Sequence, residues 1–345
     1  MNGAAEIRVP YEELQSVLSS VLIKLGFAED RARLSARLFA DASRDGVQSH
    51  GLNRFPRFVR GIRSGLVDPQ ASPRLVSRFG AFERWDGQRG PGNLNAYHSM
   101  QRAIEMSHEH GIACVGLRNT NHWMRGGNYG WQAAEAGVIG ICWTNTMPNL
   151  PPWGAIDPRL GNSPIIFAVP RREGHVVLDM AVSQFSYGAI ESYRLKGKML
   201  PVPGGFTQKG ELTSNPAEIE RSKRPLPIGY WKGSGLALML DMMASMLSAG
   251  KATHEIPSDS ERETSLSQLF IAIDPAVIGA QEDVVDRIIA DLHKATCAGD
   301  SIVRFPGEQV LRIRRDSMER GILVNASIWN EVQSLVASIK TRDRT

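Results

Sequence analysis

The sequence predicts an α/β fold in which helices at both ends enclose an interior of alternating strands and helices. Apolar residues recur at helical spacing near both ends, whereas the interior holds short β-branched and apolar runs bounded by Gly, Pro or Asn. The length of 345 residues, with 42% hydrophobic and 22% charged residues, is typical of a globular protein with a sizeable core.

Three amphipathic helices are expected first. Apolar positions follow helical spacing over residues 14–25, 34–39 and 55–62, and a glycine follows each stretch. His50 then falls in the bend between the second and third helices. Catalytic groups are often placed in such bends.

Strands and helices alternate after the proline-containing stretch 69–73. Strands are expected at residues 82–85, 112–117, 138–145, 165–169, 176–180 and 269–273, and helices at 94–108, 131–135, 236–247, 281–298 and 326–339. Asn325 is a suitable cap for the last helix. The polar stretch 204–224, which contains Gly and Pro, is expected to be a long surface excursion over a site.

Composition narrows the classes of function. The formal charge of +4 is mild and no long Lys/Arg run is present, so we expect small anionic ligands and no nucleic acid. The longest apolar run, 236–247, contains Asp241 and falls short of the roughly 20 residues that cross a bilayer, so no membrane partner is expected. Three widely spaced cysteines form neither a disulfide framework nor a zinc motif, and no secretory signal is visible. A cytoplasmic protein is the expectation.

The segment from Ser49 to Arg54 contains the strongest candidate for catalysis. An imidazole changes charge near neutral pH, and a guanidinium pairs bidentately with a carboxylate. If a helix begins after Gly51, the spacing of four brings His50 and Arg54 together, which suits reduction of a 2-oxo acid. The alternative is a buried imidazole bonded to backbone groups, with Arg54 in solvent.

No Gly-x-Gly-x-x-Gly turn follows an early strand, so a Rossmann domain is disfavoured. The run Lys232-Gly233-Ser234-Gly235 nevertheless precedes a helix, where free N–H groups and the lysine charge attract anions. The alternative is that these glycines only allow a buried helix to pack tightly.

Further polar residues lie where strands are expected to end. The stretch 119–127 joins a strand to a helix, and His122 within it is either a second catalytic imidazole or a structural histidine. Asp179 lies in an apolar strand and must be hydrogen-bonded or paired if it is buried. No Gly-x-Ser-x-Gly elbow is present, and His50, His122 and His175 lack metal-ligand spacing, so neither a serine hydrolase nor a metal site is expected.

Taken together and in this order, the motifs resemble those of the malate/L-lactate dehydrogenase family of non-Rossmann NAD(P)-dependent oxidoreductases. The resemblance covers nearly the whole chain from about Ile7 onward. The motifs are Ser49-His50-Gly51 with Arg54, Asn119 to His122, Trp143-Thr144-Asn145, Pro152-Trp153-Gly154, Leu178-Asp179-Met180-Ala181 with Ser183, Lys232-Gly233-x-Gly235-Leu236 and Pro306-Gly307-Glu308. The runs 46–58, 121–127 and 229–235 are most similar to a branch that reduces an open-chain dioxo sugar acid.

The resemblance implies a homodimer. It also implies a mixed central sheet in a nucleotide-binding domain and a helical domain built from both chain ends. The implied boundaries are residues 1–80 for the first helical part, 81–300 for the nucleotide-binding domain, and 301–345 for the segment that returns to the helical domain.

The resemblance further implies NADH-dependent reduction of the C2 carbonyl of 2,3-diketo-L-gulonate or a near relative, with NADP as the other possible cofactor. His50, charged before the step, is the implied proton donor. The implied substrate-binding residues are Ser49, Arg54, Asn121, His122 and Arg125. The implied cofactor-binding residues are His175, Val176, Val177, Leu178, Asp179, Met180, Ala181, Trp231, Lys232, Gly307, Glu308 and Gln309.

Two alternatives to this substrate remain open. One is a simpler 2-oxo or 2-hydroxy acid, such as malate, lactate or ureidoglycolate, or a cyclic imino acid. The other, from a different class, is a sugar-acid-binding protein without catalysis.

Overall fold

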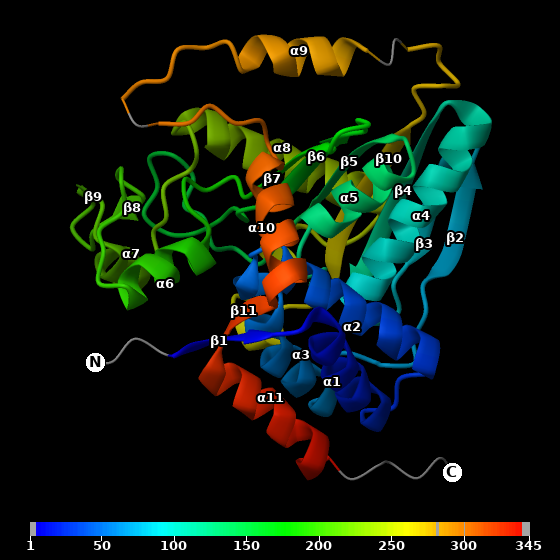
Figure 1. The fold of residues 1–345 in the computed structure, drawn as a ribbon, viewed down its shortest axis with the longest axis horizontal. Coiled ribbons are helices and arrows are strands. Elements are labelled where there is room, and N and C mark those ends of the chain that lie inside the picture. Colours follow the sequence, from blue (N-terminus) through cyan, green and yellow to red (C-terminus); the bar gives the residue numbers. More distant parts are fainter. Residues whose placement is uncertain (1–4, 281–282, 300, 340–345) are drawn as a thin grey trace.

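The computed structural model describes residues 5–280, 283–299 and 301–339, and it confirms the α/β fold (Figure 1). A seven-stranded mixed sheet has the order β2-β3-β4-β10-β5-β6-β7, in which only the β3–β4 pair is parallel. The strands are β2 (Arg74–Phe79), β3 (Phe82–Asp86), β4 (Ile112–Thr120), β5 (Ile139–Thr144), β6 (Ile165–Val169), β7 (Val176–Met180) and β10 (Leu266–Ile273). This largely antiparallel order agrees with the prediction against a Rossmann domain.

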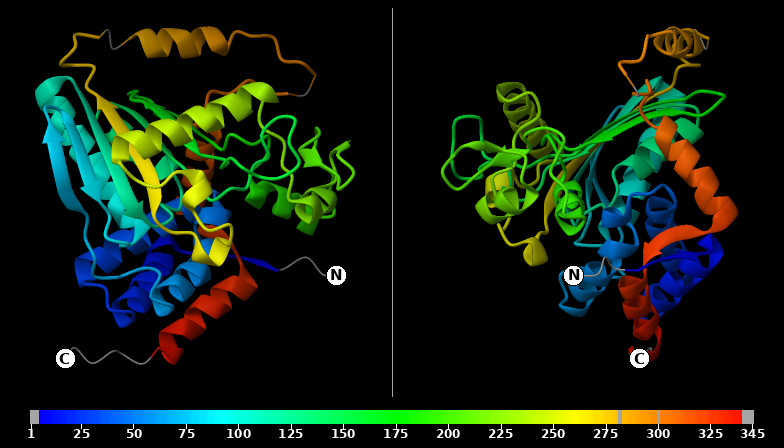
Figure 2. Two further views of the ribbon diagram at one scale, coloured as in Figure 1. Left: turned by 180° about the vertical axis from the view of Figure 1, so that it is seen from behind. Right: turned by 60° about the vertical axis from the view of Figure 1, so that its left-hand side comes forward.

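Helices cover both faces of the sheet (Figure 2). On one face, α4 (Gly92–His110) and α5 (Gly127–Glu135) pack over a buried cluster that includes Phe270 from β10. On the other face, α8 (Trp231–Ser248) packs over a cluster that includes Leu269. Neighbouring residues of β10 therefore face opposite layers, as the alternation of side chains along a strand requires.

The two chain ends form one helical unit, as expected. Strand β1 (Glu6–Val9) pairs antiparallel with β11 (Ile322–Asn325). Around this ribbon lie α1 (Tyr11–Lys24), α2 (Glu29–Arg44), α3 (Phe55–Arg63), α10 (Glu308–Arg320) and α11 (Ala326–Ser338). One apolar core joins α1, α2, α3 and α11, and in it Phe39 of α2, Phe55 of α3 and Val332 of α11 are fully buried. Val310 and Leu311 of α10 pack instead against the cluster on the sheet. Asn325 caps α11 as predicted, because its side chain accepts from Ser327 and Ile328 N–H.

Parts of the predicted secondary structure were wrong. Strands β1, β2 and β11 were not expected, because β1 and β11 have only four residues each and β2 mixes charged, polar and apolar residues without strict alternation. The stretch 204–224, expected to be a long surface excursion, has secondary structure of its own that was not expected: β8 (Gly205–Phe206), β9 (Leu212–Thr213) and α7 (Pro216–Ser222). Fully buried Ile219 packs this unit against α6 (Tyr187–Leu195).

The helix predicted at 281–298 is shorter in the structure, where α9 spans Val284–Leu292. Residues 281–282 lie outside the described residues, and 293–298 form a turn followed by irregular chain. The apolar periodicity predicted the helix, but it also continued beyond its end. Within the described part of the chain, no helix is long and apolar enough to cross a membrane.

Candidate functional site

His50 lies in the predicted bend, on the first of two short 3₁₀ turns, Gln48–His50 and Leu52–Arg54. The bend is fixed against α2, because Leu52 N–H donates to the Ser43 hydroxyl at 2.8 Å. A Cβ at Gly51 would come within 2.2 Å of that hydroxyl oxygen, so only glycine fits between the two turns. The sequence thus holds His50 and Arg54 at the edge of the helical unit.

Two imidazole rings meet at this point. The ring centroids of His50 and His122 are 5.8 Å apart, and the two ring planes are nearly parallel. Nδ1 of His50 lies 2.9 Å from the Ser49 hydroxyl, and Nδ1 of His122 accepts the Met124 N–H at 3.0 Å. Each ring therefore keeps Nε2 for another partner. His50 is half-buried and its Nδ1 faces the Ser49 hydroxyl, whereas the alternative interpretation expected a buried imidazole bonded to backbone groups.

The surroundings of both rings favour their neutral forms. Burial first, and then the charges of Arg54 and Arg125, lower the pKa of His50 to about 4. Burial and Arg54 also hold the pKa of His122 well below its usual range. His50 is therefore neutral at pH 7 in this structure, and an anion at Arg54 would offset one cause of the shift.

Arg54 lines a small cavity next to His122. Its side chain is 21% exposed and donates no hydrogen bond to any residue that the structure describes; Glu263 is its nearest acidic neighbour, at 4.0 Å. Burial, followed by the charge of Arg57, lowers the pKa of Arg54 to about 10, so the guanidinium is charged at neutral pH. The cavity has a volume of about 40 Å³, and Asn121 and Met124 also line it. Charged donors without a partner at a cavity wall are suited to bind a carboxylate.

Asn121 also lines this cavity, but its side-chain amide and oxygen already form hydrogen bonds within the protein. Its amide donates to the carbonyls of Arg89 and Gly90 at 2.7 and 3.0 Å, and its oxygen accepts the Thr264 hydroxyl at 2.8 Å. These bonds fix the loop that carries His122. Sequence reasoning assigned Asn121 to the substrate, and the structure gives it this additional task.

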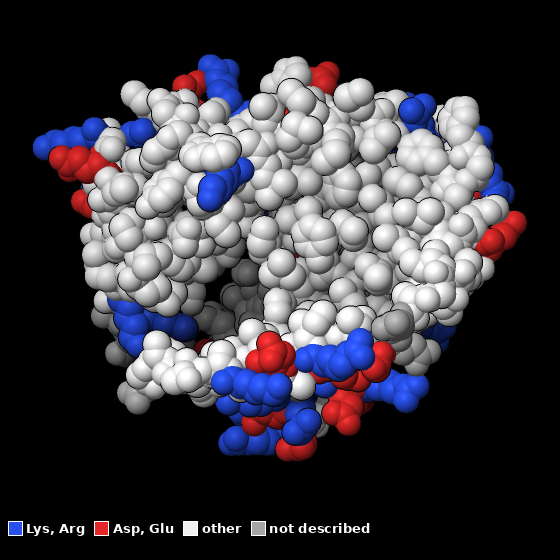
Figure 3. All heavy atoms as spheres, turned by 90° about the horizontal axis from the view of Figure 1, so that it is seen from above, with Lys and Arg blue, Asp and Glu red and all other residues white. Residues whose placement is uncertain are grey.

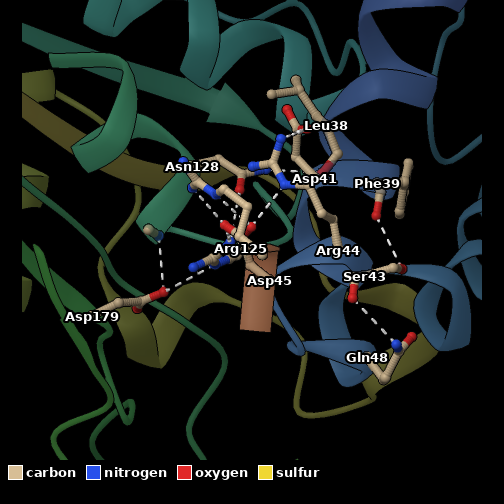
Figure 4. A network of polar contacts seen from close by, with 12 residues as sticks. Leu38, Phe39, Asp41, Ser43, Arg44, Asp45, Gln48, Arg125, Asn128 and Asp179 are labelled. Carbon is tan, nitrogen blue, oxygen red and sulfur yellow. Dashed lines mark hydrogen bonds and ion pairs between the residues drawn. The ribbon is translucent and has the colours of Figure 1, made fainter. Parts of the chain in front are cut away.

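Arg125 is part of a buried ionic network and does not line the cavity (Figure 4). Its Nη1 contacts Asp45 at 2.6 Å, and its Nε lies 3.8 Å from Asp179. Asp45 also binds Arg44 at 2.8 Å and Arg314 at 2.8 and 2.9 Å. Burial opposes ionisation of Asp45, but these guanidiniums outweigh it and lower the pKa of the carboxyl. The network joins α2, the loop before α5, β7 and α10.

The segments predicted to bind the cofactor lie on or near β7, a strand at the edge of the sheet. The strand itself carries Val176, Val177, Leu178, Asp179 and Met180. His175 precedes it and Ala181 follows it. At the start of the strand, Val177 N–H donates to the Pro306 carbonyl at 2.9 Å. Gly307 follows at a φ of 97°, where an added Cβ would lie 3.1 Å from Val177 N. Beyond its end, Ile228 N–H donates to Val182 at 2.9 Å, three residues before Trp231.

Within these segments, several groups remain available. Trp231 is 66% exposed, and Lys232 beside it is exposed and forms no ion pair with a described residue. Oε1 of Gln309 is buried without a hydrogen-bond partner among the described residues. Glu308, in contrast, accepts from Phe305 N–H and approaches His293 at 3.4 Å.

The run Lys232-Gly233-Ser234-Gly235 was expected to precede a helix, but α8 begins at Trp231, so its two glycines lie in the first turns of the helix. They have different roles. A Cβ at Gly233 would lie 2.2 Å from the Ile228 carbonyl, so this position needs glycine for packing. At Gly235 nothing lies within 4 Å of an added Cβ. The packing interpretation therefore holds for Gly233, while the exposed helix start with Lys232 still offers an anion-binding position.

Sequence reasoning missed Asp45, Arg314, Glu261 and Glu263. None belongs to a recognisable motif, and their partners are distant in the sequence: Asp45 and Arg314 are 269 positions apart. Only the fold brings them to the site. A dense set of charges in one buried place is not visible as a local pattern.

Comparison with known proteins gives three findings. A family model described as malate/L-lactate dehydrogenase matches residues 9–333. The 2,3-diketo-L-gulonate reductase of Salmonella paratyphi A is 46% identical over 333 residues, which cover 95% of this chain and 100% of that protein. Among solved structures, sulfolactate dehydrogenase from Methanocaldococcus jannaschii has a TM-score of 0.89 at 27% identity, covering 96% of this chain and 97% of that one. Delta1-piperideine-2-carboxylate reductase from Pseudomonas syringae has a TM-score of 0.85 at 28% identity, covering 95% and 99%.

Proposed function

The chain belongs to the malate/L-lactate dehydrogenase family and is an oxidoreductase, and from this premise we propose that it reduces the C2 carbonyl of 2,3-diketo-L-gulonate. The product is the corresponding 2-hydroxy acid, 3-dehydro-L-gulonate. The similarity to 2,3-diketo-L-gulonate reductase over the full length supports this substrate. NADH is the proposed reductant, and NADPH is the alternative to be tested beside it.

One observation carries the proposal: Arg54 presents a charged guanidinium without a hydrogen-bond partner at a cavity wall shared with His122, and His50 stacks on that ring. A 2-oxo acid needs a cation for its carboxylate and a proton donor at its carbonyl oxygen. We assign the first role to Arg54 and the second to His50. A positioned acid of this kind contributes about 10²–10⁴-fold to the rate.

In this scheme, binding of the substrate favours protonation of His50. The substrate carboxylate offsets the charge of Arg54, which is one cause of the low pKa of His50. His50 then takes up a proton as the substrate binds and donates it to the alkoxide that forms at C2. The expectation of a charged imidazole thus applies to the complex.

The residues around β7 fit a dinucleotide. Exposed Trp231 offers a ring for stacking, Lys232 a free charge for phosphate, and Gln309 a buried oxygen in need of a donor. Gly307 has no Cβ, so its backbone can lie close to Val177 of β7. When bound, the reduced nicotinamide supplies the hydride to C2.

A homodimer and a cytoplasmic location are also proposed. Helix α8 exposes an apolar face that no described segment covers, with Leu238, Met239, Met242 and Met246 between 42% and 76% exposed. Figure 3, which looks onto the molecule from above, shows a broad central area with few charged side chains. An uncharged patch of this kind is typical of a surface between subunits.

The test follows loss of NADH or NADPH absorbance with 2,3-diketo-L-gulonate, malate-type, lactate-type and cyclic imino substrates. His50→Ala is expected to lower kcat by at least about 100-fold while circular dichroism shows an unchanged fold. Equal turnover in both proteins would refute the role of His50. A parent enzyme that binds either nucleotide but reduces no substrate would instead favour a binding protein.

A further inference from the structure

Residues 259–264, here called the strap, cross the cavity beside Arg54. They include the short 3₁₀ turn Ser260–Arg262, which Asp259 caps by accepting the Glu261 N–H at 3.0 Å. At the end of the strap, the Thr264 hydroxyl donates to Asn121 at 2.8 Å. Ser260, Glu261 and Glu263 line the cavity together with Arg54 and His122. The strap therefore holds two carboxylates next to the proposed substrate position.

The two carboxylates differ in their partners. Glu261 is 51% exposed and pairs with Arg57 and Arg60, each at 3.4 Å. The side chain of Glu263 is 7% exposed; its Oε1 accepts the Met147 N–H at 3.3 Å. Its Oε2 accepts no hydrogen bond from a described residue, and its ion pair with Arg54 is long, at 4.0 Å.

Binding of a substrate carboxylate to Arg54 removes this compensation from Glu263. A buried carboxylate then needs hydrogen-bond donors, because an unpaired charge away from water is costly. A hydroxylated tail supplies such donors. A second carboxylate supplies none and adds repulsion, which is how charge excludes a wrong partner.

We propose that Glu263 determines substrate specificity at this site. Its Oε2 accepts hydrogen bonds from the hydroxyl groups of the substrate tail, and its negative charge repels the second carboxylate of a dicarboxylate substrate. This inference rests on the proposed function and adds the residue that would distinguish a sugar acid from malate-type substrates. The tail of 2,3-diketo-L-gulonate carries three hydroxyl groups, on C4 to C6, that can donate hydrogen bonds to Oε2 of Glu263.

Glu263→Gln tests the inference, because it removes the charge and keeps the shape. The variant and the parent are compared by kcat/KM on 2,3-diketo-L-gulonate, on oxaloacetate and on 2-oxobutanoate, which has neither hydroxyl groups nor a second charge. We expect a loss of about tenfold or more on the sugar acid and a gain of about tenfold on oxaloacetate. On 2-oxobutanoate we expect a change below about threefold, so a general structural defect cannot give this pattern.

Glu109→Gln is the matched control. It removes the same charge from the surface, because Glu109 lies at the C-terminal end of α4 and is 68% exposed. The substrate preference of this variant should equal that of the parent. A Glu263→Gln enzyme whose ratio of oxaloacetate to sugar-acid efficiency moves less than about threefold would overturn the inference. If this variant does not fold, the parent decides: oxaloacetate should be reduced at least about tenfold less efficiently than 2-oxobutanoate, and equal efficiencies would overturn it. A parent inactive on every 2-oxo acid would instead refute the proposed function itself.

Discussion

Replacing Asp45 by Asn should strongly destabilise the protein, because this carboxylate holds three guanidiniums together. The Asp45 side chain is 1% exposed, and its partner Arg125 is 3% exposed, so neither charge can turn to solvent. Removing one partner of a buried ion pair costs about 3–5 kcal/mol. Arg44 and Arg314, at 17% and 21% exposure, are partly hydrated and add less. We expect a loss of about 4 kcal/mol in the free energy of unfolding.

Urea unfolding at pH 7, followed by circular dichroism, measures this loss. Asp41→Asn, in the last turn of α2 just before Asp45, is the control, because Asp41 is 20% exposed and its bond from the Tyr11 hydroxyl can persist. We expect it to cost about 1 kcal/mol or less. If Asp45→Asn is no more destabilising than Asp41→Asn, the reasoning about the network is wrong.

The effect of Asp45→Asn should also depend on pH. The folded-state pKa of Asp45 lies below its unfolded value, so its stabilisation is complete above the unfolded value of about 3.9. The stabilisation disappears as the pH falls through the folded-state pKa. Parent and variant should therefore converge in stability under strongly acidic conditions. A difference that stays constant from pH 7 to strong acid would contradict the assignment.

Two further predictions concern catalysis and assembly. The pKa of His50 in the free enzyme is about 4, so kcat/KM should fall by about tenfold per pH unit between pH 5 and 8. A flat pH profile would contradict the role of His50 as proton donor. Arg54→Gln removes a nearby positive charge and should raise the pKa of His50 in an NMR titration. The parent should sediment as a dimer and Met242→Lys, on the exposed face of α8, as a 37.9 kDa monomer; a monomeric parent would remove the dimer from the proposal.

The sequence predicted the class of fold and the position of the first site residue for physical reasons that act locally. Helical spacing of apolar residues defines α1 to α3, and the glycine after each helix ends it. His50 lies between two of these helices, so its place in a bend could be read from the periodicity. The same reasoning predicted six of the seven strands of the central sheet from their apolar runs, and it missed β2.

The remaining features depend on contacts between distant parts of the chain. The pairing of β1 with β11 involves two strands of four residues each, which have no strong pattern of their own. Arg125 was predicted from its motif to bind the substrate, whereas in the structure its guanidinium forms an ion pair with Asp45. The free oxygen of Glu263 follows from the course of the strap. Such features arise from tertiary packing, which local patterns do not encode.

The side chain of Gln48, two residues before His50, donates to the carbonyl of Leu323 at 2.7 Å, 275 positions further along. During synthesis the amino-terminal helices leave the ribosome long before the strand that completes their core. Until that strand has been made, the neighbourhood of His50 lacks one of its walls. Newly made chains therefore complete the surroundings of His50 only after Leu323 has been synthesised, and the many distant contacts favour slow folding.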